Sequence, residues 1–265
     1  MSLLSRLIGG DEFRKAQEAD LPRRLAILTP ETTIGWIDVI EQALPLVALE
    51  TPKRTCDYGP WRKALGELQA PEQPDETYTE RFADADSGLI NFSTDASKPG
   101  WPQDHAHLVE FALRYLEADV MLFRSGYVKR HLLRRLRQAV LDRKQTERAV
   151  ALIKRVVTHG SGLEEFREFK RLSVRVGDDD LREWLEKMAE GAYVNADHFS
   201  GYFHVFHPLL EVGKYAPTGW FQCPNEPAKL DVFSLNVVKK KGVPDDNRIK
   251  VNAWCVLNHM RLNER

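Results

Sequence analysis

The chain has 265 residues, of which 43% are hydrophobic, and its formal net charge is −1. This hydrophobic content excludes a disordered chain, and the length allows one large domain or two smaller ones. No apolar run approaches the roughly 18 residues that a membrane-spanning helix needs, and the first residues lack the long apolar core of a secretory signal. We therefore expect a cytoplasmic protein without a membrane partner.

Charge is distributed very unevenly along the chain. Residues 1–120 contain 12 Lys and Arg against 21 Asp and Glu, a balance of −9. Residues 124–155, called the basic segment below, contain 11 Lys and Arg against 2 Asp and Glu, a balance of +9. A segment with this much positive charge needs an anionic neighbour, either elsewhere in the protein or in a partner.

Residues 1–69 are predicted to form an N-terminal helical region. Thr29 is a suitable N-cap and Pro30 suits the first helical position, so a helix is expected to begin there. Pro45 is expected to end this helix, because proline has no backbone N–H to donate. A second, short helix is predicted to begin at Pro60.

Residues 70–103 differ in composition from the region before them. They contain four prolines and seven acidic residues, with little hydrophobic periodicity. This pattern predicts a long acidic loop or linker. We expect it to lie across the basic segment as an internal counter-charge.

Residues 104–191 carry the strongest helical signal. The periodicity predicts helices at about 128–141 and 144–158, and Asp178 is a suitable N-cap for another. A capping box at 161–164 precedes a further helix. Five helices with short connections predict an antiparallel α-helical array. The alternation of helix lengths is similar to that of HEAT-type proteins, and a simple bundle is the alternative.

Residues 192–265 begin with many aromatic side chains and then contain two runs with strand-like composition. The runs are Leu230–Val238 and Arg248–Leu257, separated by Gly, Pro and Asn residues that favour turns. We therefore predict a β-hairpin here. The expected fold class is mainly α, an antiparallel helical array with a small C-terminal β-hairpin element.

The basic segment provides the first candidate site. Arg130, Arg134 and Arg137 recur at helical spacing, and arginine suits phosphate or carboxylate recognition. Nearby cations that would support them are Lys129, Arg135 and Lys144. The leading hypothesis is a non-enzymatic interaction or adaptor protein, whose partner is an acidic protein surface or a nucleic acid. The alternative is that the acidic N-terminal part neutralises this charge internally.

A nucleic-acid-processing enzyme is the second hypothesis. Arg124 and His131, in the stretch RSGYVKRH, resemble the Arg and His pair of HEPN ribonucleases, in which the pair flanks the scissile phosphate. A metal-dependent hydrolase would instead use a histidine cluster, because imidazole is a common metal ligand. The candidates for that cluster are His198, His204 and His207.

Cysteine usage indicates neither a disulfide framework nor a zinc site. Cys56, Cys223 and Cys255 are far apart in the sequence, and no CxxC pair is present. The chain also lacks the glycine-rich fingerprints of nucleotide-binding loops. We therefore expect buried or incidental thiols and no cofactor.

Overall fold

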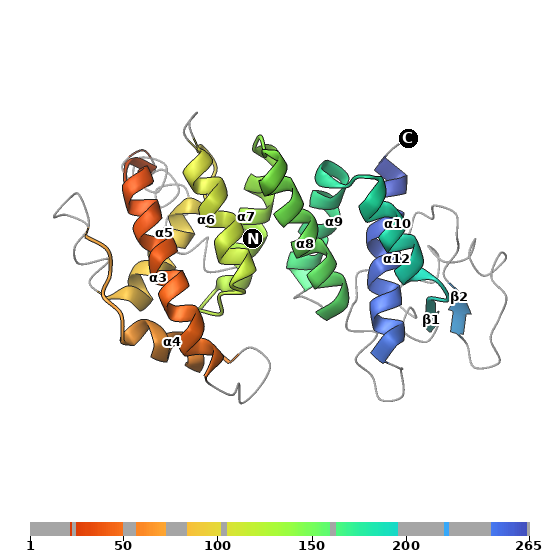
Figure 1. Ribbon diagram of the computed structural model, residues 1–265, viewed down its shortest axis with the longest axis horizontal. Coiled ribbons are helices and arrows are strands. Elements are labelled where there is room, and N and C mark those ends of the chain that lie inside the picture. Colours follow the sequence, from red (N-terminus) through yellow and green to blue (C-terminus); the bar gives the residue numbers. More distant parts are fainter. Residues whose placement is uncertain are drawn as a thin grey trace, which may run out of the picture. The chain divides into compact units, whose positions relative to one another are not determined.

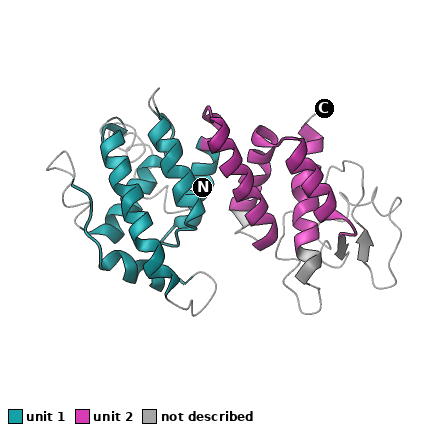
Figure 2. Cartoon of the chain, viewed as in Figure 1, with its two compact units in different colours: residues 1–135 teal, residues 136–265 magenta. Residues whose placement is uncertain are grey.

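The computed structural model describes residues 22, 25–49, 57–72, 84–101, 105–159, 163–195, 220–222 and 245–263. In this part of the chain most residues are helical, as the sequence predicted (Figure 1). The chain divides into two compact units, residues 1–135 and residues 136–265 (Figure 2). The division falls within helix α7 (Ser125–Gln138), inside the region where a helical array was expected.

The first unit is built around helix α3, which packs against α4, α5 and α6. Its helices before α7 are α3 (Pro30–Ala48), α4 (Gly59–Gly66), α5 (Ala85–Ala96) and α6 (Ala106–Glu117). Aromatic side chains from three of these helices meet in the core. The rings of Trp36 and Phe92 stack with centroids 5.9 Å apart, and Phe92 meets Phe111 edge-on at 4.9 Å. All three side chains are fully buried.

Helix α3 begins as predicted but does not end where expected. The side chain of Thr29 accepts a hydrogen bond from the backbone N–H of Thr32 at 3.3 Å, and Pro30 occupies the first turn. The prediction that Pro45 ends the helix was wrong, because α3 continues to Ala48. Pro45 and Glu41 are both exposed, so the carbonyl that loses its N–H partner can bind water instead.

Helix α5 corrects the expectation of an irregular acidic segment at 70–103. The carboxylate of Asp84 accepts a hydrogen bond from the N–H of Ser87 at 2.8 Å and so caps the helix. Asp86 forms an ion pair with Arg62 of α4 at 3.1 Å. The buried side of α5 consists largely of small residues around Leu89 and Phe92, which makes its periodicity weak in the sequence.

The second unit contains the end of α7 and the helices that follow it. These are α8 (Arg143–His159), α9 (Leu163–Val176), α10 (Asp179–Ala189) and α12 (Asp245–Asn263). Asp178 caps α10 as predicted, accepting a hydrogen bond from the N–H of Leu181 at 2.8 Å. Helix α12 packs against α8, α9 and α10, although some fifty residues separate it from α10 in the sequence (Figure 1).

The predicted C-terminal β-hairpin was wrong at its second strand. Residues 248–257 belong to α12, and every residue from 251 to 258 is buried. A continuous apolar run fits a buried strand or a buried helix equally well, so periodicity could not separate them. The other predicted strand, 230–238, lies outside the described residues. A short antiparallel pair joins β1 (Tyr193–Asn195) to β2 (Trp220–Gln222).

In the described part of the chain, no helix combines the length and the apolar composition needed to cross a bilayer.

Candidate anion-binding site

Helix α7 is amphipathic, and it carries most of the arginines that the sequence analysis selected. Its inner side is apolar and buried, formed by Val128, Leu132, Leu133 and Leu136. Residues three or four positions apart share a side of a helix. The opposite side therefore presents Tyr127, Arg130 and Arg134, with His131 beside them.

The turn that leads into α7 has an unusual backbone. Asp119 and Arg124 both adopt positive φ angles, of 51° and 63°, which non-glycine residues rarely do. The ammonium group of Lys129 on α7 lies 2.6 Å from Oδ1 of Asp119 and 3.4 Å from the sulfur of Met121. Lys129 is buried, so this cation fixes the turn rather than presenting its charge to a partner.

Two aromatic rings stand exposed at this turn. Phe123 is 62% exposed and Tyr127 is 63% exposed. The guanidinium group of Arg124 lies over the Phe123 ring, 5.1 Å from its centroid. Burying a large aromatic side chain away from water is favourable, so two exposed rings four residues apart indicate a contact surface. The sequence analysis missed both rings, although they stand within the basic segment or directly beside it.

We call the surface formed by these side chains the α7 face. Its members are Phe123, Arg124, Tyr127, Arg130, His131 and Arg134.

The electrostatic environment of His131 is strongly positive. Burial lowers the pKa of His131, and the charges of Arg134, Arg130, Lys98 and Arg135 lower this pKa further. Lys98 follows the C-cap of α5, so two helices bring these cations together. With a pKa below its usual value of about 6.5, His131 is uncharged at neutral pH. An anion bound here would offset this concentration of positive charge.

The arginines of α7 are not loose surface side chains. Arg130, Arg134 and Arg135 are half-buried, and each also interacts with neighbouring groups of the protein. Partial burial restricts these side chains and so lowers the entropy that they would lose on binding a partner.

Arg137 and Lys144 belong to the second unit and are placed differently. Arg137 is 35% exposed and lies 3.9 Å from the buried carboxylate of Glu168 on α9. Arg171 approaches the same carboxylate at 2.9 Å. Lys144 is exposed near the start of α8. Arg137 therefore contributes to an ion pair within its own unit.

Two of the acids expected to act as a counter-charge, Asp84 and Asp86, have partners outside the basic segment. Asp84 caps its own helix and Asp86 pairs with Arg62. Acids that contact the basic segment include Asp119 and Glu168, which lie outside 70–103. The basic segment is thus compensated in part by carboxylates at the turn before α7 and on α9.

The enzyme candidates are placed as follows. Arg124 is exposed in the turn before α7, and His131 is half-buried one and a half turns into that helix. The histidines at 198, 204 and 207 lie outside the described residues. Within the described ranges, no group of three His, Cys, Asp or Glu side chains could hold a metal ion.

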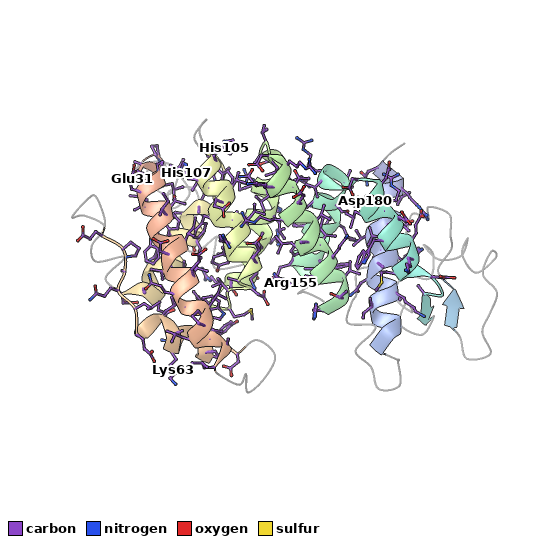
Figure 3. The ribbon with its side chains drawn as sticks, in the orientation of Figure 1. Glu31, Lys63, His105, His107, Arg155 and Asp180 are labelled. Atoms are coloured by element: carbon purple, nitrogen blue, oxygen red, sulfur yellow. The ribbon has the colours of Figure 1, made fainter. Side chains whose placement is uncertain are left out.

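Another histidine, His107, has a structural role. Nε2 of His107 on α6 lies 2.8 Å from the carbonyl oxygen of Leu28, just before α3. Figure 3 shows His107 close to Glu31 at this end of the two helices. Hydrogen bonds from its own backbone N–H and from the Thr29 side chain lower the pKa of Glu31, and the electrostatic interaction with His107 lowers it further. His107 therefore helps to join α6 to α3.

Cys255 is buried in α12, and burial raises the pKa of its thiol to about 11. A thiol with so high a pKa carries almost no thiolate at neutral pH and is a poor nucleophile. This agrees with the expectation of a structural thiol.

Comparisons with models of protein families, with curated proteins and with solved structures found no match for this chain. Its function is therefore inferred from the chemistry of the α7 face.

Proposed function

We propose that this protein is a non-enzymatic interaction protein that binds a nucleic acid through the α7 face. The observation that carries this proposal is the set of cations around His131, supplied by α7 and by Lys98, which follows the C-cap of α5. Between Asp119 and Asp142 the chain has six Lys and Arg and no Asp or Glu. A field of one sign attracts a polyanion, and binding releases the counterions held by its phosphates, so the affinity falls as the salt concentration rises.

The form of the cations also favours phosphate ligands. Arginine presents a planar set of donors that fits phosphate oxygens, and its charge persists at every physiological pH. Arg130 and Arg134 are one helical turn apart, on the side of α7 that faces away from the core. An acidic protein surface is the other partner predicted from the sequence, and the experiment below separates it from a nucleic acid.

Binding of a labelled 20-nucleotide strand and a 20-base-pair duplex tests the proposal, measured by fluorescence anisotropy at about 50 and 200 mM salt. The test variant is Arg130→Gln/Arg134→Gln. The control is Arg62→Gln/Arg143→Gln, which removes two exposed arginines that are not members of the α7 face. We expect the test variant to bind at least about tenfold more weakly and with a shallower salt dependence.

Two results would overturn the proposal. One is equal affinity of the test variant and the control, because the α7 face would then not be the binding surface. The other is the absence of binding to both nucleic acids at about 50 mM salt, where phosphate contacts are strongest. The second result would leave the acidic protein surface as the partner to pursue.

Nucleic-acid cleavage is a second candidate, favoured by the state of His131. Its lowered pKa leaves the imidazole uncharged at neutral pH, which is the form that a general base requires. Arg124, in the turn before the same helix, would contact the scissile phosphate in a HEPN-like reaction. Loss of RNA cleavage in His131→Ala, with binding retained, would support this role, and an unchanged cleavage rate would refute it.

A further inference from the structure

The two exposed rings add a feature that a purely electrostatic surface does not need. Tyr127 lies on the same side of α7 as Arg130 and Arg134, three and seven residues further along. With a rise of 1.5 Å per residue, the span from Tyr127 to Arg134 is roughly 10 Å. Phe123 stands just before the helix, beside Arg124. Aromatic and cationic groups therefore succeed one another over a short distance.

A partner that fits this surface has flat apolar groups linked to anionic groups. The bases of a duplex are stacked on each other, so their faces cannot reach a protein ring without unstacking. In a single strand the base faces are accessible, and proteins that bind single strands combine a positively charged groove with stacking on aromatic side chains. A duplex would therefore meet only the cations of the α7 face, whereas a single strand would meet the rings as well.

We infer that the α7 face recognises single-stranded nucleic acid, with bases stacked on Phe123 and Tyr127 and phosphates bound by Arg130 and Arg134. This inference rests on the proposed function and names the form of nucleic acid that the site selects. Stacking tolerates any base, because every base has a π face. We therefore expect weak dependence on sequence and a clear preference for single strands over duplexes.

The turn before α7 holds the ring of Phe123 in its exposed position. Lys129 bonds to Asp119 at the start of the turn, and Arg124 at its end has a φ of 63°. The cation over the Phe123 ring further restricts it. A ring held in place loses little entropy when a base stacks on it, so the fixed turn should increase affinity.

The test compares a 15-nucleotide oligo(U), an oligo(dT) of equal length and a duplex of equal length, all binding to the full chain. Comparing oligo(U) with oligo(dT) shows whether the protein prefers single-stranded RNA or single-stranded DNA. The variants are Phe123→Leu, Tyr127→Leu and the double substitution, since leucine is apolar and forms helix well but has no flat ring. Tyr58→Leu is the control, because Tyr58 is also an exposed ring of the first unit.

We expect each ring substitution to weaken single-strand binding by about tenfold, with unchanged salt dependence because the phosphate contacts remain. The ring variants should bind the duplex with unchanged affinity. The Tyr58→Leu control should bind all three nucleic acids as tightly as the unsubstituted protein does. Equal affinities for single strand and duplex, with no effect of the ring substitutions, would overturn this inference but leave the proposed function intact. Failure of all three nucleic acids to bind would overturn both.

Discussion

Lys129 and Asp119 form an ion pair of 2.6 Å in which the lysine is buried and the aspartate is 70% exposed. The pair joins the first turns of α7 to Asp119, the second residue after the end of α6. A buried ammonium group is costly without a hydrogen-bonded carboxylate. The aspartate also tolerates its positive φ better than most residues. Asp119 therefore both adopts the backbone conformation that the turn requires and compensates the charge of Lys129.

Asp119→Asn should reduce the free energy of unfolding by about 1–2 kcal/mol, because asparagine accepts the positive φ but leaves Lys129 with a neutral acceptor. Urea unfolding at neutral pH measures this change. The control is Asp38→Asn, at an exposed position on α3, where we expect less than about 0.5 kcal/mol. Equal stabilities of the two variants would show that the ion pair does not hold the turn.

Nucleic-acid affinity should increase as the pH falls from about 7 to about 5. A phosphate near His131 opposes the effect of Arg134, Arg130, Lys98 and Arg135, so the pKa of His131 is higher in the complex than in the free protein. The complex then binds more protons than the free protein, and linkage makes acid favour binding, by at most about tenfold per pH unit.

Anisotropy titrations across this pH range, with His131→Gln as the variant, measure the effect. The variant should lose most of the pH dependence. His159→Gln is the matched control, since His159 is exposed at the end of α8. A wild-type affinity that does not change with pH would place His131 away from the bound phosphate.

Gly88→Ala should destabilise the first unit by about 1–3 kcal/mol. A β-carbon at this position of α5 would overlap the buried indole ring of Trp36. Gly66→Ala is a matched control, because a β-carbon at Gly66 on α4 would meet no atom within 4 Å. Alanine there should be neutral or slightly stabilising, since it forms helix better than glycine. If Gly88→Ala were equally harmless, α5 would not pack on Trp36 as described.

Asn252→Ala should lower the free energy of unfolding of the second unit by about 1–3 kcal/mol. The buried side chain of Asn252 on α12 donates a hydrogen bond of 3.0 Å to the carbonyl of Val157, in the last turn of α8. That carbonyl has no partner within its own helix. Denaturant unfolding, with Asn263→Ala as an exposed control, tests the contribution of this bond. A loss no larger than in the control would contradict it.

The helices whose starts were predicted correctly have N-cap residues that can be recognised from a short stretch of sequence. Thr29 and Asp178 cap their helices with hydrogen bonds to residues three positions away, so a short stretch of sequence contains the whole interaction. Helix α5 was missed because its periodicity is hidden by small residues that pack against Trp36, more than 40 positions earlier. Residues 248–257 were misassigned because α12 is buried on all sides, and tertiary packing overrides the strand-like composition.

The candidate site could be predicted in part. The concentration of arginine on α7 follows directly from spacing and charge. The contribution of Lys98 depends on the tertiary structure that places its charge near His131, which no local pattern in the sequence indicates. The exposure of Phe123 and Tyr127 likewise depends on the turn that Lys129 and Asp119 fix, and aromatic residues are more often buried.

The packing of α12 against α8, α9 and α10 has a consequence for how the second unit folds. The hydrogen bond between Asn252 and Val157 joins residues 95 positions apart, and closing a loop of that length costs about 4 kcal/mol in chain entropy. Helices usually fold quickly through contacts between near neighbours, but this core needs a distant one. During synthesis, α8, α9 and α10 therefore leave the ribosome before the helix that covers their apolar sides, so this unit should be more dependent on chaperones than its helical content suggests.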